Sequence, residues 1–460
     1  MEGDAGSGST RPGPRSTRGS HALSVAFNEV CDGKLWFAST KELQLASLEF
    51  CIACRNHQTL HLRVDAETPR TLLAAVTAPP PHPKRLCRTR VPRLRARRVT
   101  WNMPTATELR MPIFALKDVD CLRFGGAFNG GLEDVVWPRR LKIIVFDDNS
   151  SCFDQPIELV QWPASLQELD FGGYFNQPIE DVEFPPSLQR LVFGCLFNQP
   201  IADVILPNSL KYFCVGADFD HPIEDVRWPS SLEQMTFGKY FNQPIEEVVW
   251  PSSLIELTFR RRSRFDQPIE GVVWPASLRQ LAVGECFDQP IEWCTFPASL
   301  EELEFGADFN QPVEDVTWPD SLQKLAFGRQ FNQPVGNVRW PASLEEVSFG
   351  VDEVCGVETL MMFSEFNQPI GTSAWPASMR RLTLGHKFRQ SLQGLGTWMP
   401  NLETFNLLDY GSGIEDSLLH GIEWPKALCE LVVFMDSSFD GVVVPSNVEV
   451  SRFNNEAAHW

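Results

Sequence analysis

The sequence lacks the features of a membrane or secreted protein. No apolar run approaches the roughly 18 residues of a membrane-spanning helix, and the polar start, residues 1–20, has no hydrophobic core of a secretion signal. Its 12 cysteines have no paired spacing, which favours reduced thiols acting as small apolar residues. We therefore expect an intracellular, cytoplasmic protein. An organellar transit peptide is the alternative, and Glu2 and Asp4 argue against it.

Motifs for catalysis and metal binding are also missing. No Ser/His/Asp set, phosphate loop or pair of acid/base carboxylates stands outside the repeat pattern described below. Cys51, Cys54, His57 and His61 are possible zinc ligands, but Cys54 and His57 lie too close for a zinc finger, which favours buried thiols. We expect no enzyme activity, cofactor or metal. The alternative is a parallel β-helix enzyme acting on carbohydrate, with the arginine cluster at 260–264 as its one candidate site.

Basic residues are scarce after the first hundred positions. Residues 1–100 hold 16 Lys and Arg against 8 Asp and Glu, and the remainder holds 24 against 51, so the formal charges are +8 and −27. The acidic part should repel nucleic acid and anionic membranes and favour basic protein partners. The stretch 84–98 is basic, without acids or aromatics. It reads as a linker that contacts the acidic part, or as a nuclear-localisation or RNA-binding segment, which leaves a nuclear location open.

One repeat dominates the chain. A segment of the type Phe-Asn-Gln-Pro-Ile-Glu-Asp-Val-x-Trp-Pro-x-Ser-Leu-x-x-Leu-x-Phe-Gly recurs with its first Phe at 153, 175, 197, 219, 241, 265, 287, 309, 331 and 366. A period near 22 residues is typical of leucine-rich-type coils, each too small to bury its own apolar face. We predict a repeat solenoid with a parallel β-sheet. The expected regions are a disordered tail (1–20), a small, possibly helical region (21–78), a Pro/Arg-rich basic linker (79–100) and the solenoid (101–455).

Some repeat positions are expected to be structural because only residues of one kind occupy them. Asn and Asp alternate at the position of Asn176 and share an acceptor oxygen, which predicts capping of backbone amides, with a metal-ligand column as the alternative. Trp gives way to Phe or Leu at the position of Trp250, so this column fills volume. Gly172 and its counterparts are expected at positive φ or at a close approach to the next coil. The structural columns are represented by Phe175, Asn176, Pro178, Ile179, Trp250, Pro251, Leu254, Leu257 and Phe259.

Other positions vary and are free to encode a partner. The outward strand positions change from coil to coil, whereas the inward ones do not. Glutamates after the Ile position form an acidic stripe, read as a solvated face or a docking strip for a basic partner. The 13 extra residues between Gly350 and Phe366 either fold back or offer an apolar docking element, and the arginine cluster neutralises nearby acids or binds an anion. Candidate partner-binding residues are Arg190, Tyr212, Arg260, Arg261, Arg262, Arg264, Leu360, Met361, Met362, Phe363 and Arg381.

The Phe-Asn-x-Pro-Ile coils, with Pro-x-Ser-Leu-x-x-Leu-x-Phe-Gly between them, resemble the FNIP-repeat family, a variant of the leucine-rich repeat, over about residues 128–388. The resemblance implies a curved or straight solenoid used for protein binding, with no catalytic residue to carry over. We expect a non-enzymatic, monomeric scaffold for protein–protein interaction. Some members resemble ubiquitin-ligase adaptors with an F-box before the repeats. A substrate-receptor role is therefore the alternative function, although residues 21–62 lack the opening Leu-Pro of an F-box.

Overall fold

The computed structural model describes residues 60–64, 96–101, 119–146, 151–350, 364–371, 373–408, 419, 421–434 and 443–453. The predicted tail, the potential zinc ligands Cys51, Cys54 and His57, most of the F-box candidate 21–62 and the insertion residues 351–363 lie outside these ranges. Leu360, Met361, Met362 and Phe363 are among them. What the sequence predicts for these segments therefore stays a prediction.

The described chain winds into one parallel sheet of 17 strands, in which each strand pairs with the next along the sequence. Leu169 pairs with Leu191 and Leu191 with Phe213, one coil apart each time, which confirms the predicted solenoid. The lone helix of the described residues, α4 (Leu395–Trp398), has four residues, and no helix in these ranges is long and apolar enough to cross a membrane. The strands are β1 (Leu60–Val64), β2 (Ala96–Trp101), β3 (Cys121–Phe124), β4 (Ile143–Phe146), β5 (Glu168–Asp170), β6 (Arg190–Val192), β7 (Tyr212–Cys214), β8 (Gln234–Phe237), β9 (Glu256–Phe259), β10 (Gln280–Ala282), β11 (Glu302–Glu304), β12 (Lys324–Phe327), β13 (Glu346–Phe349), β14 (Arg381–Leu384), β15 (Thr404–Leu408), β16 (Glu430–Phe434) and β17 (Glu449–Phe453).

The ladder begins earlier than the sequence suggested. β2 occupies the last residues of the expected basic linker, and β1 lies inside the region expected to be helical. Leu62 of β1 pairs with Val99, and Val99 pairs with Leu122 of β3, so both strands continue the same rungs. The residues Arg97, Arg98, Val99 and Thr100 do not follow the repeat pattern, which is why no coil was predicted there.

The core consists of columns that run through the stack. Phe175, Leu254 and Leu257 have no exposed surface, Ile179 is 1% exposed and Trp250 is 7% exposed. Each column packs on its equivalent in the next coil, and together they form one continuous apolar cluster. The apolar columns identified in the sequence are thus the core of the solenoid.

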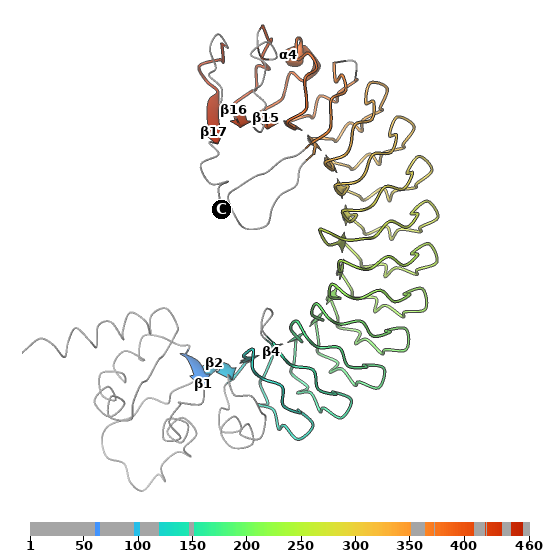
Figure 1. Ribbon diagram of the computed structural model, residues 1–460, viewed down its shortest axis with the longest axis vertical. Coiled ribbons are helices and arrows are strands. Elements are labelled where there is room, and N and C mark those ends of the chain that lie inside the picture. The colour runs from blue at the N-terminus through green and yellow to red at the C-terminus, as the bar shows by residue number, and fades with distance from the viewer. Residues whose placement is uncertain are drawn as a thin grey trace, which may run out of the picture.

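The stack curves, with the sheet on the concave side of an open arc and the Trp-Pro arms on the convex side (Figure 1). The spacing of successive coils explains the curvature. Neighbouring strands lie about 4.8 Å apart, whereas the ring centroids of Phe171 and Phe193 are 5.4 Å apart. Farther from the sheet the spacing is 6.3 Å, between Trp250 and Trp274. Each coil is therefore a wedge that is thinner at its strand.

Two polar ladders join successive coils at the corners. Asn176 Oδ1 accepts the backbone N–H of Asn198 at 2.9 Å and the side-chain amide of Gln199 at 2.9 Å, and the same bonds recur in coil after coil. This confirms the predicted amide capping, which the Oδ1 atom provides. The second ladder uses the Ser of Pro-x-Ser-Leu, where Ser187 Oγ donates to the carbonyl oxygen of Leu166 at 2.6 Å. This serine ladder was not predicted from the sequence.

The glycine column follows each strand and permits a close approach between coils. A Cβ built on Gly328 would lie 1.6 Å from the carbonyl oxygen of Gly306, so any side chain would collide with the backbone of the preceding coil. Gly172 and Gly350 have positive φ, at 67° and 90°. Of the two reasons expected from sequence, close approach is therefore the general one, and positive φ applies at these two positions of the column.

Where a coil carries extra residues, a buried serine closes the corner. Phe171 and Phe175 are four positions apart, but the equivalent Phe259 and Phe265 are six apart. Ser263 Oγ accepts the backbone N–H of Phe265 at 3.2 Å, and Ser364 makes the same bond to Phe366 at 3.2 Å. Both serines have no exposed surface. The described residues next to these insertions therefore keep their place in the core.

Candidate functional site on the concave face

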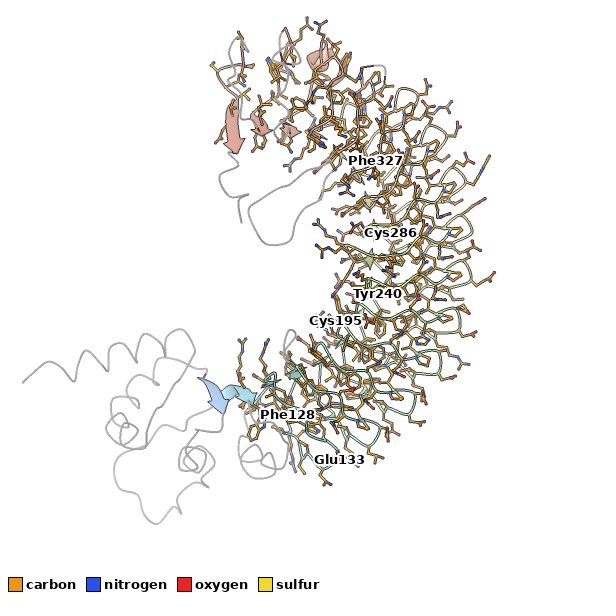
Figure 2. The ribbon with its side chains drawn as sticks, in the orientation of Figure 1. Phe128, Glu133, Cys195, Tyr240, Cys286 and Phe327 are labelled. Carbon is orange, nitrogen blue, oxygen red and sulfur yellow. The ribbon has the colours of Figure 1, made fainter. Side chains whose placement is uncertain are left out.

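The concave face is formed by the first and third residues of each three-residue strand segment, which point away from the core. In β5 these are Glu168 and Asp170, both half-buried, while Leu169 between them is fully buried. Figure 2 shows the side chains along the whole arc, with Glu133 on the convex side. Because the same two positions recur on every rung, the concave face carries two parallel rows of side chains.

Two of the predicted partner-binding residues meet on adjacent rungs. The guanidinium carbon of Arg190 lies 4.0 Å from the centre of the Tyr212 ring, a cation–π contact between β6 and β7. Both side chains are half-buried. The contact fixes an aromatic and a cation in one orientation on the concave face.

A third predicted residue joins this pair from farther along the chain. Nη2 of Arg260, in the arginine cluster, lies 3.2 Å from Sγ of Cys214. Burial raises the pKa of the Cys214 thiol, and the charge of Arg260 acts in the opposite direction. We name Arg190, Tyr212, Cys214 and Arg260 the β6–β9 cluster. The sequence did not reveal it because Arg260 is 46 positions from Cys214. Two 22-residue periods lead from Cys214 to Thr258 of β9, and Arg260 follows two positions later, which is the signal that places it two coils away.

Two positions expected to face a partner are buried instead. Cys214 has no exposed surface and Val192 is 9% exposed. For Cys214 the physical reason is the guanidinium of Arg260, which lies against its sulfur. Ser348 and Thr383, farther along the same row, are also buried. The third strand position thus supplies less of the binding surface than the sequence suggested.

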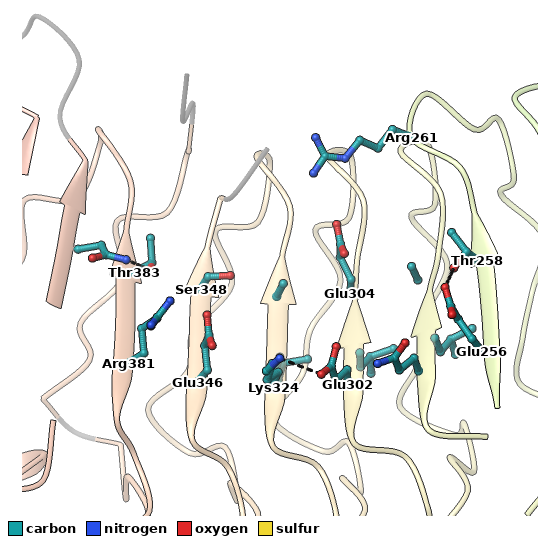
Figure 3. A pocket seen from close by; sticks show the side chains of 17 residues that line it. Glu256, Thr258, Arg261, Glu302, Glu304, Lys324, Glu346, Ser348, Arg381 and Thr383 are labelled. Atoms are coloured by element: carbon teal, nitrogen blue, oxygen red, sulfur yellow. Dashed lines mark hydrogen bonds and ion pairs between the residues drawn. The ribbon is translucent and has the colours of Figure 1, made fainter. Parts of the chain in front are cut away.

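The middle of the concave face, from β9 to β15, is a hollow of about 650 Å³ (Figure 3). Acidic and basic residues alternate along its first row, where Glu302 pairs in register with Lys324, Lys324 with Glu346, and Glu346 with Arg381. The Lys324 Nζ lies 2.8 Å from Glu302, and this bond raises the pKa of Lys324. The hollow is therefore of mixed charge, in contrast to the acidic character of the whole array.

Two charged groups in the hollow remain available to a partner. Neither Glu346 nor the predicted residue Arg381 forms an ion pair with any residue that the structure describes. Glu256, by contrast, accepts a hydrogen bond from Gln234 at 2.7 Å. Figure 3 shows Glu346 and Arg381 on adjacent strands at the floor of the hollow.

The remaining arginines of the cluster lie at the edge of the concave face. Arg261, Arg262 and Arg264 follow the end of β9 and are exposed, and Arg261 lines the hollow (Figure 3). Arg260 thus brings the arginine cluster close to the pair Arg190 and Tyr212, because it contacts Cys214. Arg381, on β14, lies near the other end of the hollow.

The convex side carries exposed apolar residues that sequence reasoning missed. Trp293 is 70% exposed, and Val249 and Val273 on nearby coils are 78% and 79% exposed. The signal was present in the sequence: at the repeat position of Trp293 most other coils carry a polar residue or glycine, such as Asp181, Asp203 or Gly271, and Leu159 is an apolar exception.

Comparisons with known proteins agree with this architecture. The family model described as the FNIP repeat matches residues 175–218, 219–261, 265–308 and 309–352. CroV588, whose structure is described as a novel circular leucine-rich-repeat protein, is 30% identical, with a TM-score of 0.53 over 79% of this chain and 60% of that one. The chain thus spans less than two thirds of that protein. A comparison with curated proteins finds no significant match.

Two further solved structures are similar at lower identity. TLR13, in a complex with ssRNA13, is 12% identical over 83% of this chain and 55% of that one, with a TM-score of 0.49. An internalin from Listeria monocytogenes is 12% identical over 76% of this chain and 94% of that one, with a TM-score of 0.42. The four tandem matches and the similarity to CroV588 decide the assignment. The chain is a leucine-rich-repeat-like solenoid built from FNIP repeats.

Proposed function

We propose that the protein is a non-enzymatic scaffold that binds a protein partner on its concave face. The observation that carries this proposal is the division of each coil into a constant core and a variable inner row. Phe175 and its equivalents are buried and stacked throughout, while the first strand position changes from Glu168 to Arg190 to Tyr212 in three successive coils. Solenoids of this kind use their extended concave surfaces for binding.

The composition of that face supports a protein partner. Tyr and Arg are the residues most often found at binding hot spots, and Arg190 with Tyr212 provides one of each in a fixed orientation. The hollow beside them offers Glu346 and Arg381, which are charges of both signs without internal ion pairs in the described chain. A partner surface of mixed charge would complement both groups.

The proposal is tested by comparing partner recovery among variants. We expect the double substitution Arg190→Ala with Tyr212→Ala to lose the proteins that the unaltered chain captures from its source cells, measured by quantitative mass spectrometry. The matched control is Glu247→Ala with Glu270→Ala, two exposed residues of the convex side. Equal recovery with both double variants would overturn the proposal.

The ubiquitin-ligase alternative depends on residues 21–62, of which the structure describes only 60–62. Those three residues belong to β1 and pair with β2. No contact in the described chain favours the substrate-receptor role over a simple scaffold. Docking by the insertion 351–363 likewise remains a prediction from its apolar residues.

A further inference from the structure

The strongest concentration of unpaired positive charge in the described chain lies at the corner beyond β8 and β9. Lys239 and Arg264 lie over the ring of Tyr240, and Arg260 and Arg262 belong to the same turn as Arg264. We name these five residues the basic rim. Arg260 directly follows β9, and the backbone N–H of Arg264 donates to the carbonyl oxygen of Lys239 at 2.7 Å. The two coils thus present these side chains at one edge of the concave face.

Contacts with neighbouring groups hold three of the cations in place. The guanidinium carbon of Arg264 is 4.6 Å and the ammonium of Lys239 is 4.8 Å from the centre of the Tyr240 ring. Arg260 is held by its contact with Cys214. A site whose side chains are already ordered loses less conformational entropy when it binds a ligand. The basic rim is therefore organised before binding.

Acidic neighbours do not neutralise this charge. Within the described residues Arg260, Arg262 and Arg264 form no ion pair, although Arg279 pairs with Glu301 one coil later and Lys211 pairs with Glu233 one coil earlier. Internal neutralisation, one of the two roles that the sequence suggested for the cluster, therefore does not apply to these three arginines. Binding of an external anion is the role that remains.

The backbone of the rim is also unusual. Arg262 is the sole non-glycine residue of the described chain with positive φ, at 62°. A residue with a side chain is disfavoured in this conformation. Ser263, fully buried and bonded to the N–H of Phe265, anchors the turn immediately after it. The two extra residues of this coil thus form a fixed turn that carries Arg262 outward.

The flanking coils limit the length of an anion that fits. Asp218 precedes the rim on the coil of β7, and Glu285 and Asp308 follow it at the same corner on the coils of β10 and β11. With coils about 4.8 Å apart at the sheet, the positive region is only two coils wide. A long polyanion would meet these carboxylates at both ends, whereas a single phosphoryl group would not.

We propose that the basic rim binds a phosphorylated side chain in a peptide segment of the protein partner. Planar guanidinium groups donate paired hydrogen bonds to phosphate oxygens, which suits the three arginines to a dianionic group. The edge position lets such a segment continue onto the concave face, where Arg190 and Tyr212 lie two coils away. This inference rests on the proposed function, since it names the chemistry of the same partner.

The test is direct binding of a fluorescein-labelled Ala-Ala-phosphoSer-Ala-Ala peptide to the full chain, followed by anisotropy at about 0.15 M salt. We expect it to bind at least about tenfold more tightly than the unphosphorylated peptide, because charge-assisted bonds contribute more than neutral ones. The variant Arg260→Gln, Arg262→Gln, Arg264→Gln should lose that difference, and Arg264→Gln alone should lose part of it.

The matched control replaces two exposed arginines of the convex side, Arg227→Gln and Arg339→Gln, and should bind like the unaltered chain. Equal affinity for both peptides, or full retention by the triple variant, would overturn the proposal. A single-stranded oligonucleotide of about 12 nucleotides is the competing probe. If it bound more tightly than the phosphopeptide and lost affinity in the triple variant, the rim would be a nucleic-acid site instead.

The outcome separates this proposal from the one on which it rests. If the basic rim bound both peptides equally, capture of protein partners through Arg190 and Tyr212 would still stand as a proposal. Conversely, loss of capture has no bearing on binding of the isolated peptide. Because all three substituted arginines are exposed, the variants should keep the melting temperature of the unaltered chain, which circular dichroism checks.

Discussion

At the scale of single residues, the tryptophan column illustrates packing without hydrogen bonding. The indole N–H of Trp250 is buried and has no hydrogen-bond partner, and the same is true of Trp274, Trp318 and Trp340. These side chains therefore contribute apolar volume, and each buried N–H without a partner costs about 1 to 3 kcal/mol. Phe184 and Phe296 occupy the same column in other coils without disturbing it.

The column predicts a graded response to substitution at Trp250. Trp250→Ala should destabilise the protein by about 3 to 5 kcal/mol through the cavity it leaves. Trp250→Phe should cost less than about 1.5 kcal/mol, because it keeps an aromatic ring and removes the unpaired N–H. Glu246→Ala, on the exposed arm of the same coil, should be near neutral. Thermal melts check the order, and a Glu246 variant less stable than Trp250→Ala would contradict the inside and outside assignments.

The glycine column predicts a contrast between two Gly→Ala variants. Gly328→Ala should destabilise by about 3 kcal/mol or more, since its Cβ would lie 1.6 Å from a backbone oxygen that cannot move alone. Gly271 is the control, because a Cβ there meets its nearest atom, the carboxyl carbon of Glu246, at 3.7 Å. Chemical denaturation measures both variants. Similar stabilities would show that the coils are farther apart than described.

Thiol reactivity tests the burial of individual cysteines. Burial, aided by the nearby Glu270 carboxylate, raises the pKa of Cys294 to about 12. A raised thiol pKa keeps the thiol protonated, so near pH 8 Cys294 should resist iodoacetamide in the folded protein. The exposed Cys195 should react. Mass spectrometry of the labelled chain measures the order in which the two cysteines are alkylated. Alkylation of Cys294 before Cys195 would be inconsistent with this packing.

At the scale of the repeated element, the Asn ladder links each coil to the next through an acceptor oxygen. Asn310 Oδ1 accepts the N–H of Asn332 at 2.9 Å and the side-chain amide of Gln333 at 3.2 Å. The preceding rung of the ladder is Asp288, which makes the same bonds to Asn310 and Gln311. This corner thus requires an acceptor oxygen on a short side chain, and it does not require an amide group.

Substitutions at Asn310 separate these two chemical properties. Asn310→Ala should cost about 1 to 3 kcal/mol, because it leaves the Asn332 N–H without its acceptor. Asn310→Asp should be close to neutral, since the carboxylate keeps that acceptor. Equilibrium denaturation measures the difference. Equal losses for both variants would mean that the ladder does not depend on the acceptor oxygen.

The elements and their inward columns were predictable from the sequence because packing restricts each column to one kind of residue. Phe175, Asn176 and Trp250 could be assigned from the repeated copies alone. The β6–β9 cluster was not predictable, because it depends on a side chain from one coil reaching across another. The burial of Val192 was missed because it occupies the third strand position, which the repeat pattern predicts to point outward.

At the scale of the whole molecule, curvature follows from small differences in spacing. The spacing grows from about 4.8 Å at the strands to 6.3 Å at the Trp250–Trp274 pair and 6.4 Å at the Trp318–Trp340 pair, so the wedges add into the arc of Figure 1. The sequence predicts the stack but not its curvature, because the spacing of each column depends on how the rings tilt. The curvature brings the variable rows to the inner side, where neighbouring rungs are closest.

The central claim is that the concave face binds the partner and the convex side does not. Site-specific incorporation of a photo-crosslinking amino acid tests it most directly, at exposed Gln280 of the concave face and at exposed Glu270 of the convex side. The two positions lie in the same coil, so folding defects would affect both equally. We predict covalent adducts with protein partners from Gln280 and none from Glu270. Adducts from Glu270 alone would contradict the account.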